Sequence, residues 1–275
     1  MRQERTLSVV STVLLIIFAM ISFFPIYMVV VNSFKSQEEI FSNVLALPSK
    51  LHFENYTQAF SQVNLLQVTM NSVVVTVVGL VGIVLAGALA GYKLARTPGR
   101  MSNIFFLLFM SSMLIPFHSI MITLTQSAKA LGLQGSTGGL GLIYIGVGVN
   151  MAIFLCHGFV KTIPKELEES AKIDGAGEFQ TFIKIIFPLL LPILMTVAIL
   201  DILWIWNDFL LPLLMLTDVN DYTLILSVNM LFGEYVNDWP KILASLIMTT
   251  LPIVIFYAFF QRYILAGIAE GAVKG

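Results

Sequence analysis

Hydrophobic and polar positions follow one another in long blocks along this chain. Six apolar blocks are separated by short polar ones, and they lie near 7–31, 68–92, 103–125, 139–160, 185–211 and 242–261. A helix of about 20 residues crosses the hydrocarbon layer of a bilayer. The pattern therefore predicts an all-α polytopic membrane protein with six transmembrane helices, the first of them kept as an anchor.

Composition agrees with this prediction. The chain has 275 residues, of which 57% are hydrophobic and 11% charged, and its mean hydropathy is +0.90. An ordinary water-soluble domain has roughly 25% charged residues. No linker or change of composition divides the chain, so we expect one membrane domain over residues 1–275. A net charge of −1 gives no indication of nucleic-acid binding.

The basic residues predict an orientation. Lysine and arginine near the ends of spans are retained on the cytoplasmic side. Of the 15 basic residues, 4 fall in one set of connecting segments, namely Lys35, Lys50, Lys129 and Lys241. The other 11 fall in the alternate set: Arg2, Arg5, Lys93, Arg96, Arg100, Lys161, Lys165, Lys172, Lys184, Arg262 and Lys274. Both termini and the segment near 161–184 are therefore expected in the cytoplasm.

The segment from Pro164 to Pro188 is a charged helix-turn-helix between two apolar runs. Glutamates 166, 168 and 169 suit the positive end of a helix that starts near Pro164. Gly175 can adopt a positive φ and end that helix. A second short helix is predicted beyond Gly177, with an apolar stripe at i, i+3, i+4 and i+7 formed by Phe179, Phe182, Ile183 and Ile186.

This hairpin resembles the EAA coupling loop of binding-protein-dependent ABC importer permeases. The family pattern has E-A-A, three residues, G, nine residues, then I-x-L-P. Here it reads Glu169-Ser170-Ala171, Gly175, and Ile185-Ile186-Phe187-Pro188. Ser170 and Phe187 are mild departures, and the spacing is kept. The resemblance implies a type I ABC importer permease fold, a coupling loop at about 161–184, and ATPase-coupling roles for Glu169, Ser170, Ala171, Asp174, Gly175 and Ala176.

Other stretches resemble the carbohydrate importer permeases of the maltose type. They are PIYMVVVNSFK from Pro25, the pair Asn71-Ser72, AGYKLAR at 90–96, IPFHSIM at 115–121 and the terminal QRYILAGIAEGAVKG. The resemblance implies that the tail at about 262–275, with Gly271 and Lys274, enters a crevice between two ATPase subunits. A frayed terminus is the alternative for this tail.

Polar residues interrupt the fifth apolar run. An ionisable residue within a membrane span is a functional candidate by default, and Asp201 is the deepest. The segment from Trp206 to Phe209 also resembles the WN-D/E-F stretch of sugar permeases. For Asp208, anchoring at the membrane interface is as good an explanation as a role in sugar binding. The predicted substrate pathway comprises Asp201, Trp204, Trp206, Asn207 and Asp208, with Tyr144 and Asn150 as further candidates for sugar contacts.

The outer segment at 217–241 is acidic and carries a predicted interfacial helix near 222–235. Asp218 and Asp221 are candidates for docking an extracytoplasmic sugar-binding protein. The single cysteine, Cys156, lies inside the fourth run, where packing is expected. His118 and His157 lack metal-ligand spacing, and we expect no metal or cofactor on this chain.

No P-loop pattern GxxxxGK[ST] occurs in the sequence, so ATP and magnesium are expected in separate ATPase subunits. The resemblance implies a permease subunit of a sugar or oligosaccharide importer in a prokaryotic plasma membrane, without enzymatic activity of its own. Expected partners are a second permease subunit, two copies of an ABC ATPase, an extracytoplasmic sugar-binding protein, the sugar and membrane lipids. The alternative is an ion-coupled secondary carrier or channel in which Asp201 titrates, although no inverted repeat is evident.

Overall fold

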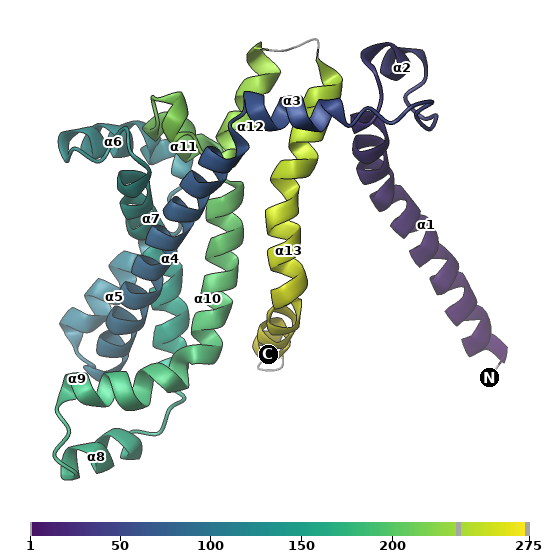
Figure 1. Ribbon diagram of the computed structural model, residues 1–275. Helices are drawn as coiled ribbons and strands as arrows, with labels where there is room; N and C mark the ends of the chain where they lie inside the picture. Colours follow the sequence, from purple (N-terminus) through teal and green to yellow (C-terminus); the bar gives the residue numbers. More distant parts are fainter. Residues whose placement is uncertain (1, 235–237, 273–275) are drawn as a thin grey trace. The chain divides into compact units, whose positions relative to one another are not determined.

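The computed structural model describes residues 2–234 and 238–272, and all regular elements in those ranges are helical. Contacts within the chain define two compact units. One contains residues up to 66 together with 227–252, and the other contains residues 67–226 together with those from 253 onward. Figure 1 shows the helices with the labels used below. The prediction of an all-α chain is confirmed.

Within the described ranges, five helices are long and apolar enough to cross a membrane. The segments that qualify are Ser11–Ser33, Leu65–Arg96, Thr137–Val160, Glu178–Asn207 and Trp239–Phe259. They lie in α1 (Arg2–Ser33), α4 (Leu65–Arg96), α7 (Thr137–Val160), α10 (Phe187–Asn207, entered through α9) and α13 (Trp239–Ala272). Their positions match five of the six predicted runs.

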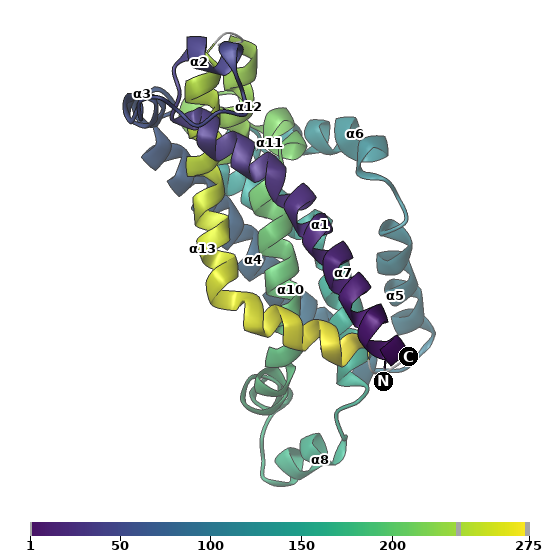
Figure 2. The same ribbon diagram turned by 90° about the vertical axis from the view of Figure 1, so that its right-hand side faces the viewer.

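The remaining predicted run is bent. It consists of α5 (Arg100–Ser112) and α6 (Phe117–Ala130), whose axes differ by 106°. Pro116 stands at the start of α6 and disfavours helical geometry at the residue before it. The six-span count therefore holds if this pair is one broken span. Figure 2 shows α6 turned sharply away from the direction of α5.

The first unit contains a hydrogen-bonded segment after α1. Its helices α2 (Gln37–Ser42) and α3 (Glu54–Gln62) are short. Ser36 and Glu39 form a capping box at the start of α2. Hydrogen bonds from the Ser49 hydroxyl and from the Ser36 amide hold the pKa of the Glu39 carboxyl below its ordinary value. Asn55 on α3 donates to the carbonyls of Ser33 and Lys35, which ties α3 to the end of α1.

In the second unit, α4 and α7 approach each other closely through small residues. A Cβ atom added to Gly87 would lie 2.4 Å from the Cβ of Ala152, and one added to Gly91 would lie 2.7 Å from the Cβ of Cys156. Neither distance is sterically possible without movement. Small residues at this spacing allow helix backbones to pack tightly inside a membrane, where van der Waals contact drives association.

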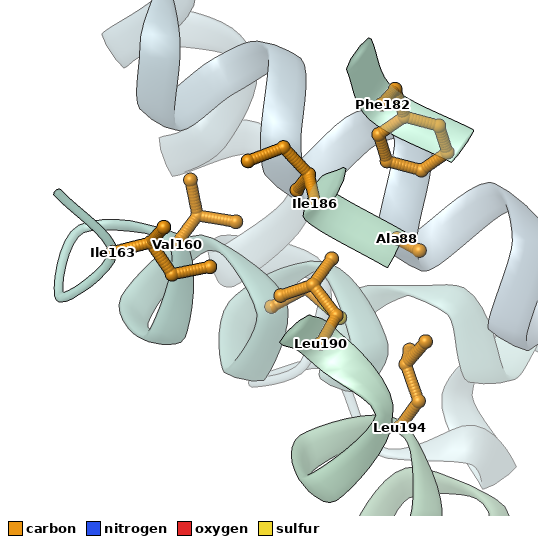
Figure 3. Packing of buried hydrophobic residues seen from close by; sticks show 8 residues of the cluster. Ala88, Val160, Ile163, Phe182, Ile186, Leu190 and Leu194 are labelled. Carbon is orange, nitrogen blue, oxygen red and sulfur yellow. The ribbon is translucent and has the colours of Figure 1, made fainter. Parts of the chain in front are cut away.

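A buried apolar cluster lies where α7, α10 and the end of α4 meet. Figure 3 shows Ile186, Leu190 and Leu194 projecting from successive turns toward the same core. The cluster comprises Ala88, Cys156, Val160, Ile163, Phe182, Ile186, Leu190 and Leu194. Cys156 is a free, fully buried thiol within it, so its predicted packing role is confirmed.

The other end of α4 is fastened to the segment after α10. The side-chain amide of Asn71 donates to the carbonyls of Asn220 and Tyr222, at 2.7 and 3.0 Å. The Ser72 hydroxyl accepts from the amide of Leu224, the first residue of α12 (Leu224–Glu234). Two short helices precede α12, namely α11 (Leu210–Met215) and a 3₁₀ turn at Val219–Asp221. The predicted helix near 222–235 exists, and its first turn is buried rather than exposed.

A hairpin anchored to α4 and a cavity beside α10

The first arm of the charged hairpin is α8 (Glu166–Ile173), and it ends in a Schellman turn. The amide of Ala176 donates to the carbonyl of Ala171, and the amide of Gly175 donates to that of Lys172. Gly175 has a φ of +85°, which glycine adopts without a Cβ clash. The predicted role of Gly175 in ending this helix is confirmed.

The second arm is not a separate helix. The four residues of α9 (Glu178–Thr181) run through a π-helical turn at Phe182–Ile186 directly into α10. The wider turn changes the helix register, so the four residues of the predicted apolar stripe do not lie on one face. Phe182 and Ile186 are buried, whereas Phe179 and Ile183 are exposed. The prediction of one continuous apolar face is wrong, because hydropathy spacing assumes regular α geometry.

An ion pair fixes α8 to α4. The Nε of Arg96 lies 2.6 Å from Oε1 of Glu168, and the Tyr92 hydroxyl donates to Oε2 at 2.8 Å. Arg96 also donates through Nη2 to the carbonyl of Ile163, just before α8. The exposed fractions of the two charged side chains are 10% and 12%. Because both are largely shielded from water, loss of either partner would leave the other charge buried without compensation.

The hairpin and the end of α4 enclose a polar cavity of about 210 Å³. Glu168 and Glu169 line it from α8, and Lys93 and Arg96 line it from α4. At its rim Lys93 lies 3.2 Å from Glu178 in an exposed ion pair. Both arms of the hairpin therefore contact the last turn of α4.

The predicted coupling residues occupy different environments. Glu169, Ser170 and Asp174 are exposed on the hairpin, Ala171 is buried and Ala176 is half-buried. Exposed apolar side chains stand among them, with exposed fractions of 85% at Ile173 and 71% at Phe179. Gly271 belongs to the last turns of α13, and Lys274 lies outside the described residues.

The sequence predicted Glu168 as a residue of the helix N-terminus and did not predict its contacts with Tyr92 and Arg96. Tyr92 and Arg96 are separated by four residues and thus share one helix face, which is polar. Glu168 shares its face of α8 with the apolar Ala171. The sequence does not reveal that the two faces meet, since 72 residues separate Arg96 from Glu168.

A larger cavity of about 710 Å³ lies between the bent pair, α7 and α10. Its wall is largely apolar, with Leu200 and Met151 as examples, and Ser112, Asn150 and Asp201 add polar groups. Asp201 and Trp204, two of the predicted substrate-pathway residues, both line it. A cavity of this size and character suits a small organic ligand.

The other predicted pathway residues do not line this cavity. Asp208 accepts from the Tyr144 hydroxyl at 2.7 Å and from the Leu210 amide at 3.0 Å, so it joins α7 to the start of α11. Asn207 is exposed and bonds the carbonyl of Leu203. Trp206 is half-buried. Tyr144 also makes an edge-on contact with Trp204, at 5.3 Å between ring centroids.

Asp218 and Asp221, the candidates for docking a binding protein, lie at the start and the end of the 3₁₀ turn. Asp218 caps it by accepting from the amide of Asn220 at 2.9 Å, and Asp221 is half-exposed. His157 stacks on Phe106 with ring centroids 3.9 Å apart. In the part of the chain that the structure describes, no cluster of three histidine, cysteine or acidic residues has a metal-site arrangement.

Comparison with known proteins places this architecture in a family. Residues 80–269, which include the hairpin, match the model of the binding-protein-dependent transport system inner membrane component. The chain is 38% identical over its whole length to all of the probable starch degradation products transport system permease protein AmyC of Thermoanaerobacterium thermosulfurigenes. It is 33% identical, again over both full chains, to the melibiose/raffinose/stachyose import permease protein MelC of Bacillus subtilis.

A solved structure has the same fold. It belongs to a bacterial ABC transporter involved in the import of the acidic polysaccharide alginate, with a TM-score of 0.85 and 23% identity. The match covers 96% of this chain and 98% of the other. The type I importer permease fold, expected from the hairpin motif, is thereby confirmed. The chain belongs to the family of binding-protein-dependent transport system inner membrane components.

Proposed function

We propose that this chain is one of two membrane subunits of an ATP-driven importer for a sugar or oligosaccharide. Support comes from its full-length relatives, whose names specify starch degradation products and melibiose, raffinose or stachyose. The multiple sugar-binding transport system permease MsmG of Streptococcus mutans, 36% identical, adds a third. An extracytoplasmic binding protein would deliver the sugar.

The observation that carries this proposal is the anchored hairpin with an exposed apolar tip. This tip is formed by Ile173 and Phe179, whose exposed fractions are 85% and 71% and which have charged residues around them. The ion pair of Glu168 fixes the first arm of the hairpin to α4. A rigid projection with such a tip suits the cleft of another protein. We assign that cleft to an ABC ATPase subunit, contacted through Glu169, Ser170 and Asp174.

Energy for transport comes from the partner in this proposal. The chain carries no phosphate-binding P-loop, so ATP and magnesium belong to two copies of a separate ATPase. When those subunits close on ATP, the hairpin moves with them. The tail with Gly271 and Lys274 is proposed to contact the same subunits. Orientation follows the basic residues, with both termini on the cytoplasmic side of a prokaryotic plasma membrane.

The cavity beside α10 is the proposed sugar path. The indole of Trp204 offers a face for the C–H side of a sugar ring, and the Asp201 carboxylate can accept from sugar hydroxyls. We propose that the path continues past Trp206, Asn207 and Asp208, near its outer end. Asp218 and Asp221 are proposed to contact the binding protein.

Replacing Trp204 tests the sugar path. In Trp204→Ala, the sugar concentration that gives half-maximal ATPase stimulation is expected to rise about tenfold, which corresponds to about 1.4 kcal/mol of lost binding. Trp239→Ala is the matched control, because that side chain does not line the cavity and is not assigned to the path. An unchanged half-maximal concentration in Trp204→Ala would remove this residue from the path.

Purification of the chain from native membranes in mild detergent tests the function as a whole. We expect a second permease and an ABC ATPase to accompany it, and the reconstituted complex to take up sugar only with ATP and binding protein. Isolation of the chain alone, with uptake driven by an ion gradient, would instead establish the secondary-carrier alternative.

A further inference from the structure

The segment after α2 folds back along the last turns of α1. The Tyr27 hydroxyl donates to the carbonyl of Leu45, and the Asn32 side-chain amide donates to that of Val44, both at 3.0 Å. Tyr27 precedes the end of α1 at Ser33 by six residues. Tyr27 and Asn32 both belong to the last two turns of α1, so residues 44 and 45 lie beside these turns. This part of α1 belongs to the candidate membrane span Ser11–Ser33.

Most side chains of this segment are apolar, and the large ones after Ile40 are exposed. Residues 40–49 read IFSNVLALPS and contain no charge. The exposed fractions are 71% at Phe41, 58% at Leu45 and 73% at Leu47. Glu39 and Lys50 bound the uncharged stretch on either side. Such a run on an irregular segment would be unfavourable in water, since each large apolar side chain buried contributes about 1.5–3 kcal/mol.

Several of its backbone groups form hydrogen bonds with neighbouring side chains. Lys35 is only 1% exposed, and its ammonium donates to the carbonyls of Asn43 and Val44 at 2.9 and 3.3 Å. The side-chain oxygen of Asn43 accepts from the amides of Leu45 and Ala46 at 3.0 and 3.2 Å. A loop in water can bond to solvent instead. Irregular backbone at membrane depth persists only where protein groups satisfy it in this way.

We propose that residues 41–47 form an interfacial flap that inserts into the lipid leaflet at the C-terminal end of α1. Phe41, Leu45 and Leu47 would contact the boundary between headgroups and acyl chains. Lipid fits better than a protein partner, because protein interfaces carry a polar rim with hydrogen-bonding groups. Here the hydrogen bonds of Lys35 and Asn43 are made within the protein, and the large exposed side chains of the segment are all apolar. The flap lies before the family-model match at 80–269, and the inference does not depend on which solute is transported.

Site-specific fluorescence in the complete transporter tests this inference. A polarity-sensitive fluorophore is attached at Leu47→Cys or Phe41→Cys, in a background in which Cys156 is replaced by alanine, and the complex is reconstituted into phosphatidylcholine vesicles. Gln58→Cys on the exposed face of α3 is the matched control. Quenching is measured with spin-labelled lipids and with aqueous iodide.

We expect the labels at positions 41 and 47 to show blue-shifted emission, to lose fluorescence to the spin-labelled lipids and to resist iodide. The label at position 58 should show the opposite pattern. Iodide quenching at 41 and 47 as strong as at 58 would place the flap in water and overturn the inference. Protection from both quenchers would also overturn it, because the flap would then be covered by protein, either the second permease subunit or the binding protein.

Discussion

Gly175 determines the shape of the hairpin at the residue scale. Its left-handed conformation costs a residue with a Cβ about 1–2 kcal/mol. No atom lies within 4 Å of a Cβ built there, so a substitution is disfavoured by backbone strain rather than by a clash. The effect of a substitution should accordingly depend on how well the new residue accepts a positive φ.

We therefore expect Gly175→Val to reduce sugar-stimulated ATPase activity and transport strongly, and Gly175→Asn to retain much of both, because asparagine tolerates this conformation. Gly177→Ser is a neighbouring control, since Gly177 has the extended φ of −75° and tolerates a side chain. Equal activity in all three reconstituted variants would show that the turn geometry is unimportant for coupling.

The Glu168–Arg96 pair gives a second prediction at this scale. Removing one partner of a buried pair leaves the other charge uncompensated and typically costs about 3–5 kcal/mol. We expect Arg96→Gln to uncouple ATP hydrolysis from transport and Tyr92→Phe to have a smaller effect. In the double variant Arg96→Gln/Glu168→Gln, the loss should be smaller than the sum of the single losses. Strict additivity in transport assays would contradict direct coupling between the two side chains.

At the element scale, α4 and α7 depend on close backbone approach. A leucine at Gly87 would collide with Ala152, whose Cβ is 2.4 Å from the position of a new Cβ. We expect Gly87→Leu to lower the melting temperature in detergent and the amount of folded protein. Gly146→Leu on α7 is the matched control, because nothing lies within 4 Å of its Cβ position. Equal melting temperatures would argue against tight packing at Gly87.

The sequence predicted the positions of the helices better than the turns and bends that connect them. The lengths of the apolar runs predicted the positions of the five long helices, and Gly175 predicted the turn that ends α8. The π-helical turn at Phe182–Ile186 was missed because it changes the register without changing the residue types. The 106° bend had a signal in Pro116, but a proline also fits an uninterrupted span with a kink.

A motif indicated the hairpin residues, and an ionisable side chain within an apolar run indicated Asp201. The hairpin residues follow a fixed spacing in the sequence, whereas the Arg96–Glu168 contact and the cavity at Asp201 require tertiary packing. Asp208 illustrates the difference. Its position beside Trp206 indicates a sugar contact, yet its two oxygens bind Tyr144 and the Leu210 amide.

For the whole molecule, orientation in the membrane is a testable expectation. Ile173→Cys on the hairpin should react with a membrane-impermeant maleimide only in inside-out vesicles, and Val219→Cys only in right-side-out vesicles. Both native side chains are exposed, and the native Cys156 is buried and should stay unlabelled. Reaction of both variants from the same side would overturn the arrangement inferred from the basic residues.

The two arms of the hairpin are connected to the membrane in different ways. The first arm is held to α4 by the Glu168 ion pair, and the second is continuous with α10 through the π-helical turn. A force applied to the tip consequently acts on more than one membrane helix. The first arm also follows α7 after only five residues, so a partner that moves the hairpin would displace α4, α7 and α10 together.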